Sequence, residues 1–109
     1  METELLFKPL RRGLLEFAVL STLSGGRLYA GEVIGRLAET PFATPEGTLY
    51  PLLGKMRRDG LLEHEWEESE SGPPRKYYRV TAAGDERLAA LKGYWQELSE
   101  TLKELGERV

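Results

Sequence analysis

An evenly spaced set of apolar residues near the end of the chain constrains its fold more than any other feature. Within residues 82–107, large apolar side chains recur at alternating steps of three and four, at Leu88, Leu91, Trp95, Leu98, Leu102 and Leu105. That spacing is the a and d seam of a heptad repeat, so it predicts one long α-helix with a continuous apolar stripe. A helix of about 25 residues is roughly 37 Å long, more than a small domain needs for its own core.

The seam predicts a helix that joins two copies of the chain. The 109 residues suffice for one domain, and the elements predicted before this helix offer too little apolar surface to cover the whole stripe. We therefore expect a homodimer whose dimer contacts are made by the seam residues. The alternative is that the helix packs entirely within its own subunit.

The composition excludes several classes of protein. The chain has no cysteine, which excludes disulfide scaffolds, thiolate nucleophiles and cysteine-ligated metal sites. A single histidine, His64, leaves no pair of histidine ligands and little room for a conventional catalytic triad. No stretch reaches about 18 apolar residues, and the first residues lack the layout of a signal peptide. We expect a cytoplasmic protein that is not an enzyme and has no cofactor, metal site or membrane contact.

The first sixty residues alternate helical patterns with helix-stop signals. Apolar periodicity predicts a helix over residues 10–23, after an irregular lead-in that ends at a proline, and a second helix over 30–40. Thr44 followed by a proline is a start signal for a third helix that runs to about Arg58. Pro51 lies inside that third helix, and it predicts either a later start or a bend.

The pattern changes to strict alternation after residue 60. Leu62, His64 and Trp66 alternate with glutamates, which predicts a half-buried strand. A polar turn over residues 69–74 then leads into a second alternating strand over 75–80, so the two strands form a hairpin. Trp66 is expected to be the apolar anchor that fixes the hairpin to the helices. His64 is expected to be a structural strand residue.

Two adjacent tyrosines in the second strand must point to opposite faces of the hairpin. Tyr78 is expected to point inward, and Tyr77 is expected to point outward, where its hydroxyl could contact a phosphate.

This order of elements predicts a mostly α-helical fold with a small β-hairpin. Three short helices followed by a hairpin form a winged helix-turn-helix, here over residues 1–80, and residues 81–109 add the long dimerisation helix to make one compact unit. In a winged helix-turn-helix the third helix enters the major groove of DNA, and the hairpin lies along the backbone or in the minor groove.

Basic residues cluster although the chain is slightly acidic overall. The 15 Lys and Arg residues are outnumbered by 18 Asp and Glu residues, which gives a net charge of −3. Nine of the basic residues nevertheless fall in three short groups: Lys8, Arg11 and Arg12; Lys55, Arg57 and Arg58; and Arg75, Lys76 and Arg79. Because salt screens distant charges, a local basic face is enough for DNA binding. Any one group taken alone also fits an ordinary solvated surface.

Two long motifs resemble those of a known family. The run GTLYPLL at residues 47–53 and the run GPPRKYYRVTAAG at residues 72–84 are similar to hallmark motifs of the PadR family of bacterial transcription regulators. The resemblance covers roughly residues 10–105 and is to the short members, which carry a single C-terminal helix. One departure is the start of the second helix, where the family usually has Gly-Tyr and this chain has Ala30-Gly31.

The resemblance implies a homodimeric winged-helix protein that binds a palindromic operator, usually as a repressor released by a small effector. Together with the charge pattern, it assigns DNA contacts to Thr48, Tyr50, Lys55, Arg58, Arg75, Lys76 and Tyr77. In similar short members, an aromatic residue of the last helix lines a flat pore for planar aromatic compounds. That position corresponds to Trp95 here, and Phe17 could line the same space.

A different class of function stays open at this point. The acidic total and the glutamate-rich hairpin also fit a winged-helix protein-interaction module without DNA binding. The salt dependence of any DNA affinity would separate the two hypotheses, because phosphate contacts weaken steeply with salt.

Overall fold

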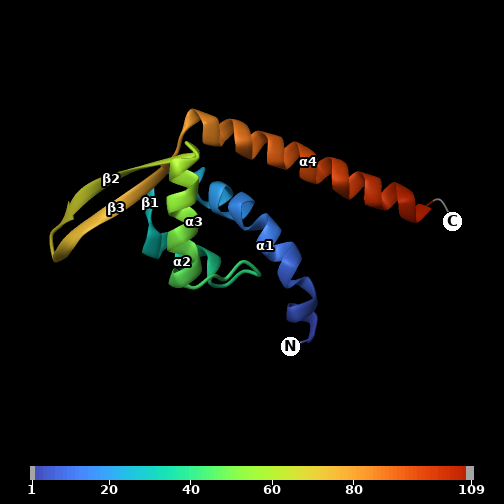
Figure 1. Ribbon diagram of the computed structural model, residues 1–109, viewed down its shortest axis with the longest axis horizontal. Helices are drawn as coiled ribbons and strands as arrows, with labels where there is room; N and C mark the ends of the chain where they lie inside the picture. The colour runs from blue at the N-terminus through green and yellow to red at the C-terminus, as the bar shows by residue number, and fades with distance from the viewer. Residues whose placement is uncertain (1, 108–109) are drawn as a thin grey trace.

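Four helices and three strands make up residues 2–107, the part of the chain that the computed structural model describes; side chains are described from Phe7 onward (Figure 1). In chain order they are α1 (Glu2–Leu23), β1 (Leu28–Tyr29), α2 (Ala30–Leu37), α3 (Glu46–Arg58), β2 (Leu62–Ser69), β3 (Gly72–Val80) and α4 (Ala82–Glu107). This mostly helical fold with a small antiparallel sheet and a long last helix confirms the predicted fold class.

The three strands form one antiparallel sheet in the order β1-β3-β2. The predicted hairpin is present, with β2 and β3 paired from Leu62 opposite Val80 out to an irregular end beside the turn. Strand β1, which is two residues long and places Tyr29 opposite Tyr77, was not predicted. A strand this short shows no alternation, so it leaves no periodic signal in the sequence.

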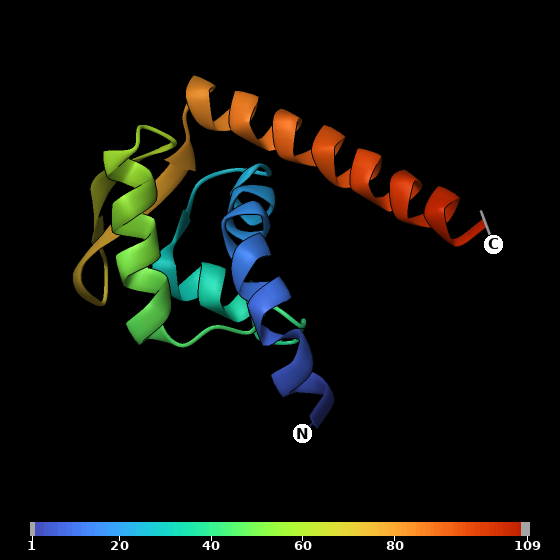
Figure 2. The same ribbon diagram turned by 45° about the vertical axis from the view of Figure 1, so that its right-hand side comes forward.

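The core lies where the first three helices meet the base of the hairpin. Figure 2 shows α1, α2 and α3 gathered beside that base, while the outer part of α4 extends away from them. The buried side chains are Val19, Leu20, Leu23, Leu28, Ala30, Val33, Leu37, Leu49, Leu53, Met56, Leu61, Leu62, Tyr78 and Leu88. All are apolar apart from the tyrosine hydroxyl, so burial of apolar surface drives this packing.

Helix α1 begins at Glu2, so the prediction of an irregular lead-in before residue 10 was wrong. Pro9 lies inside the helix on an exposed side, where its ring costs one backbone hydrogen bond. The helical stripe continues across it, because Phe7 and Leu10 extend the face that carries Leu14 at steps of three and four. Helix α2 is shorter than predicted and ends at Leu37, after which the Thr40 N–H donates to the Leu37 carbonyl in a turn.

Helix α3 starts at Glu46 with Pro45 as its N-cap residue, and Pro51 lies within it on the exposed side. The Thr44 hydroxyl donates to the Phe42 carbonyl instead of capping the helix. The helix ends at Arg58, and the turn that follows passes through Gly60, whose φ of 80° glycine adopts at little cost. There the Leu61 N–H donates to the Met56 carbonyl at 2.9 Å, which satisfies one of the last helical acceptors.

The start of α4 is fixed against the core. The Gly84 N–H donates to the Thr81 hydroxyl oxygen at 3.0 Å, so Thr81 caps the helix as predicted, and the predicted bounds of the helix are confirmed. A Cβ atom on Gly84 would overlap the carbonyl oxygen of Leu61, which leaves glycine as the residue that permits this close approach.

The seam of α4 is divided between the core and the surface. Leu88 is buried in the core of the same subunit, so the prediction that it makes a dimer contact was wrong. Leu91 is half-buried against that core, so only part of its side chain remains available for such a contact. Trp95, Leu98, Leu102 and Leu105 are exposed, Leu102 by 69%. None of the helices described in residues 2–107 combines the length and apolar character needed to cross a membrane.

Candidate nucleic-acid interface

The two faces of the hairpin carry different chemistry. Successive side chains of a strand point to opposite faces, and Tyr78 marks the inner face because it is buried against the helices, 5% exposed. Lys76 shares that inner face, whereas Tyr77 and Arg79 lie on the outer face. Between Tyr78 and the turn of the hairpin, the inner face is no longer covered by helices, so the side chains there are open to solvent next to α3.

A hollow of about 300 Å³ lies between α3 and this open inner face. It is lined by Tyr29, Ala30, Tyr50, Trp66, Pro74, Arg75, Lys76 and Tyr78. Tyr50 reaches it from α3 and is 49% exposed, and Trp66 reaches it from β2 and is 64% exposed. The Lys76 ammonium lies 5.1 Å from the centroid of the Trp66 ring, a cation–π contact.

Trp66 is therefore not the buried anchor that the sequence analysis expected. Its ring lies on the inner face as the alternation predicted, but past the point where the helices cover the sheet. An exposed indole beside a lysine is a surface on which a base or sugar can stack, rather than a packing element.

A further positive charge lies near this hollow. Arg57 of α3 lies beside His64 of β2, and the charges of Lys76 and Arg57 both act on that imidazole. Burial first, and these two cations second, lower the pKa of His64, so the ring is held neutral near pH 7. The His64 Nδ1 atom has no hydrogen-bond partner among the described residues.

Arg57 was absent from the predicted contact residues, although the sequence held a signal for it. Positions 50, 54 and 57 follow helical spacing and so share one face of α3. Gly54 lies between the two larger side chains, and the Arg58 guanidinium reaches back to it, since a Cβ there would be 3.4 Å from Arg58 Nη1. Arg58, like Arg57, is exposed on α3.

Lys55 and Thr48 lie on other sides of α3. The Lys55 ammonium donates to Asp59 at 2.8 Å, and this hydrogen bond raises the pKa of Lys55. Its other charged neighbours are Glu16 and Arg87, so Lys55 faces α1 and the start of α4. Thr48 is exposed in the first turns of α3 and faces α1 as well. The residues predicted to contact DNA thus do not form one continuous surface.

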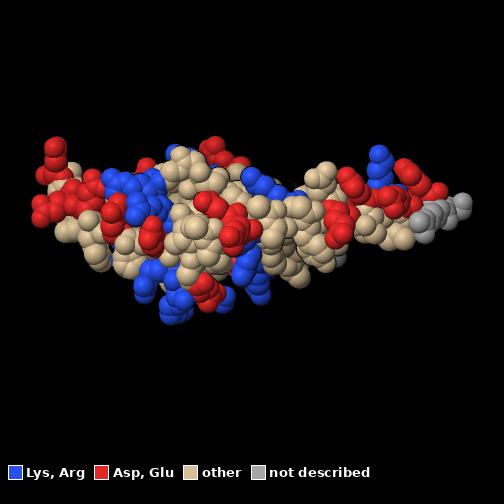
Figure 3. Space-filling model, turned by 90° about the horizontal axis from the view of Figure 1, so that it is seen from above, with Lys and Arg blue, Asp and Glu red and all other residues tan. Residues whose placement is uncertain are grey.

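The outer face of the hairpin is closed by ion pairs. Arg79 binds Glu63 at 2.6 Å, and Arg27 binds both Glu65, at 3.0 Å, and Glu67. Seen from above, acidic side chains gather at the hairpin end of the molecule and along the outer part of α4 (Figure 3). A polyanion would meet local repulsion at this face.

Tyr77 lies on this outer face, as the alternation predicted, but its ring is partly covered there, so we do not count it among the available phosphate contacts. Its ring packs edge-on against Tyr29 at 5.6 Å between centroids, and the Arg27 guanidinium covers it at 4.5 Å. Arg75 instead bends around the edge of the sheet, with its guanidinium 4.4 Å from the centroid of the Tyr29 ring, and there it lines the hollow.

Tyr29 also explains the unusual start of α2. Its ring lies over Gly31, where a Cβ would be 2.8 Å from the Tyr29 Cε2 atom. The aromatic ring and the glycine therefore fit each other, and the ring connects α2 to the sheet through its contact with Tyr77.

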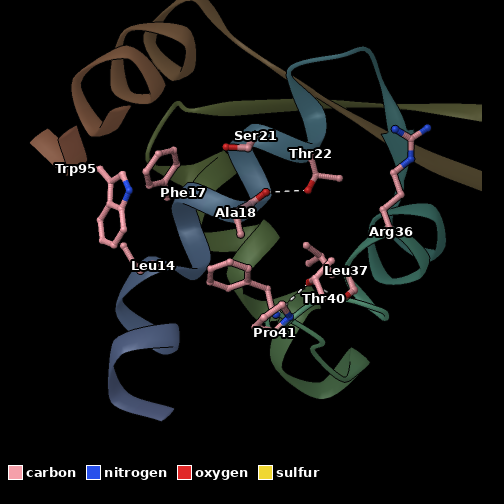
Figure 4. Close-up of a pocket in the computed structure, with 11 residues that line it drawn as sticks. Leu14, Phe17, Ala18, Ser21, Thr22, Arg36, Leu37, Thr40, Pro41 and Trp95 are labelled. Carbon is pink, nitrogen blue, oxygen red and sulfur yellow. Dashed lines mark hydrogen bonds between the residues drawn. The ribbon is translucent and has the colours of Figure 1, made fainter. Parts of the chain in front are cut away.

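An apolar cavity of about 520 Å³ lies between α1, α2 and α4 (Figure 4). Phe17 and Trp95, the two residues predicted to bind an effector, both line it. Figure 4 shows them together with Leu14 at one end of the cavity and Arg36 at the opposite end. A cavity of this size and character can hold a small aromatic molecule.

These features define a class of protein. A three-helix core with a hairpin beside its third helix is a winged helix, and an open aromatic and basic face next to that helix suits nucleic acid. Within residues 2–107 no three His, Asp or Glu side chains gather to hold a metal ion.

The chain belongs to the PadR family. The family model described as "Transcriptional regulator PadR-like family" matches residues 19–90. Members of this family are transcriptional regulators rather than enzymes, and their fold supports a DNA-binding role for this chain.

Solved structures of family members agree closely with this fold. A PadR-like transcription factor from Bacteroides fragilis is 41% identical, with a TM-score of 0.80, over 92% of this chain and 97% of the other. A PadR family regulator from Eggerthella lenta is 35% identical, with a TM-score of 0.85, over 95% and 91% of the two chains. A PadR-like regulator from Bacillus cereus is 36% identical, with a TM-score of 0.77, over 86% and 92%.

Proposed function

We propose that this chain is a cytoplasmic, dimeric, sequence-specific DNA-binding repressor. The observation that carries the proposal is the open face shared by α3 and the hairpin, where Tyr50, Trp66 and Lys76 line one hollow and Arg57 lies nearby beside His64. Aromatic rings and unpaired cations in one place provide both stacking surfaces and phosphate contacts.

Each part of this face has a separate task in the proposal. The N-terminal part of α3 enters the major groove, where Tyr50 from this face, and Thr48 from the side of the helix that faces α1, reach the base edges and set sequence preference. Arg57 and Lys76 neutralise phosphates at the edge of the groove, which adds affinity that depends on salt but not on sequence. Arg75, near the turn of the hairpin, extends the contact along the backbone.

The dimer rests on apolar surface that one subunit leaves open. Trp95, Leu98 and Leu102 on α4 remain exposed, and α1 carries a second open stripe at Phe7 and Leu10. Burying each large side chain against a partner would contribute about 2 kcal/mol. Two-fold symmetry would then place two α3 helices for the two halves of a palindromic operator.

The effector site in this proposal is the cavity that Phe17 and Trp95 line. A planar aromatic compound bound there touches both α1 and α4, the two helices that carry the open apolar stripes. Its binding therefore alters how two subunits are held together and, through that, the distance between their DNA-reading helices, which releases the operator.

Binding of DNA can be tested by fluorescence anisotropy. Duplexes from the chain's own upstream promoter and of scrambled sequence are titrated at two salt concentrations. Tyr50→Ala is expected to lower the preference for promoter DNA about tenfold or more, because a lost base contact costs about 1–3 kcal/mol. Tyr77→Phe is the matched control, since its hydroxyl lies on the closed outer face. A folded Tyr50→Ala variant that binds as the wild type does would contradict the site.

Binding of an effector can be tested separately by isothermal titration with ethidium in the absence of DNA. Saturable binding that is lost in Trp95→Ala supports the cavity as the effector site. Absence of saturable binding, or unchanged binding in the variant, removes the effector from the proposal.

A protein-interaction module without DNA binding is the second candidate, favoured by the acidic outer face of the hairpin. Weak binding that is equal for both duplexes, with little dependence on salt, would favour this candidate.

A further inference from the structure

A second basic hollow lies between α1 and the start of α3. Its volume is about 300 Å³, and it is lined by Lys8, Arg11 and Arg12 from α1, by Thr48 from α3 and by the loop over residues 41–45. No acidic side chain of the described residues lines it. It is separate from the hollow between α3 and the hairpin, which shares none of these residues.

Helical geometry explains why the cations gather there. Positions 8, 11 and 12 share one face of α1, because residues three and four apart are neighbours on a helix. Phe7 and Leu10 lie on a different face, which continues toward Leu14 and the apolar cavity beside α4. The helix must extend across Pro9 for Lys8 to take part, and α1 does so because it begins at Glu2.

The position next to α3 indicates the partner. The N-terminal end of a helix carries partial positive charge, so it adds to the field of the three cations. The hydroxyl of Thr48 is exposed at the same place. When the N-terminal part of a recognition helix enters the major groove, the surface beside it faces the sugar–phosphate backbone that borders the groove.

We propose that the basic face of α1 is a second phosphate-binding surface, which grips the DNA backbone on the side of α3 opposite the hairpin. This inference rests on the proposed DNA-binding function and deepens it. Each recognition helix is then held on both sides, by Lys76 and Arg57 at the hairpin and by Lys8 and Arg12 at α1. The α1 contacts add affinity on any sequence and no sequence preference.

The test uses the double variant Lys8→Gln/Arg12→Gln in the full chain. Both side chains are exposed, whereas Arg11 is partly buried and engaged within the protein, so it is left unchanged. The control is Lys92→Gln/Lys103→Gln, which removes two exposed cations from α4. Affinity is measured over a range of salt concentrations for a random-sequence duplex and for the upstream promoter duplex.

The double variant should lower the slope of log affinity against log salt by about 2, because each lost phosphate contact removes about 0.9. Affinity at low salt should fall roughly tenfold on both duplexes, and the ratio between them should stay unchanged. Arg12→Lys, which keeps the charge, should keep its share of the slope. The control should match the wild type.

Three outcomes would overturn the inference. An unchanged slope in the double variant, while Lys76→Gln lowers it, removes α1 from the interface and leaves the proposed function standing. A change in the ratio between duplexes without a change in slope shows base reading instead of a phosphate grip. Failure of the wild type to bind either duplex removes both the inference and the proposed function.

Discussion

Both faces of the hairpin carry cations and aromatic rings, yet they differ in what those residues are free to do. On the inner face Trp66 and Lys76 contact each other and remain open beside α3. On the outer face Arg27 and Arg79 are held by glutamates, and Tyr77 is covered. A cation of the hairpin is available to a ligand only where no carboxylate lies beside it, because a neighbouring carboxylate neutralises the charge of the cation.

The largest contrast between the faces should appear in stability. Tyr78→Ala removes a buried ring from the inner face and should lower the free energy of unfolding by about 3–5 kcal/mol. Tyr77→Ala removes a half-covered ring from the outer face and should cost about 1 kcal/mol, the scale of one aromatic pair or one cation–π contact. Urea unfolding measures the free energy of unfolding of both variants. Equal losses would contradict the expected difference between the two faces.

A smaller contrast is expected in DNA affinity. Lys76→Gln should lower the salt slope by about 0.9 and the low-salt affinity several-fold, because an unpaired cation is lost. Arg79→Gln should change neither, since the charge of Arg79 is already neutralised by Glu63 at 2.6 Å. If Arg79→Gln weakens DNA binding as much as Lys76→Gln does, the outer face also contacts DNA.

The ion pairs of the outer face should contribute little to stability. Arg27→Gln breaks the pairs with Glu65 and Glu67, and because these side chains are half exposed the free energy of unfolding should fall by less than it does in Tyr77→Ala. The difference from the wild type should shrink in 1 M salt, where screening acts over about 3 Å. A larger loss that persists at high salt would show that packing of Arg27 on Tyr77 matters more than its charge.

The smallest effect is a pH dependence on the inner face. The pKa of His64 is lowered in the folded state, by burial first and then by Lys76 and Arg57. Between the ordinary histidine pKa of about 6.5 and this lower value, the unfolded chain binds the proton more readily, so stability falls as pH falls. His64→Gln should lack this loss when unfolding is followed from pH 7 to pH 5. Parallel curves for the two proteins would contradict the assigned cause.

Much of the fold was readable from local patterns. The heptad seam and the Thr81 cap predicted the bounds of α4, and alternation predicted the hairpin together with the inward side of Tyr78. Two elements escaped this reading. The first helix was predicted to begin only after Pro9, although the apolar stripe continues through that residue, and β1 is too short for any period.

The candidate site was less readable because it depends on distances between elements. Alternation placed Trp66 on the correct face but could not show how far the helices cover that face. Tyr77 is covered by Arg27, which lies fifty residues earlier and reaches it beside β1. Leu88 fits the heptad as well as Leu102 does, and only the approach of α4 to the core separates a buried from an open position.

The contact of Gly84 with the Leu61 carbonyl has a mechanical consequence. It holds the first turn of α4 against the junction between α3 and β2, so this contact is the fixed point at which the long helix meets α3. With 26 residues at about 1.5 Å each, α4 is roughly 39 Å long, and a tilt of about 10° at this fulcrum sweeps its far end through roughly 7 Å. In the proposed dimer, a small change in the angle between the two subunits would therefore produce a large displacement at the far ends of their α4 helices.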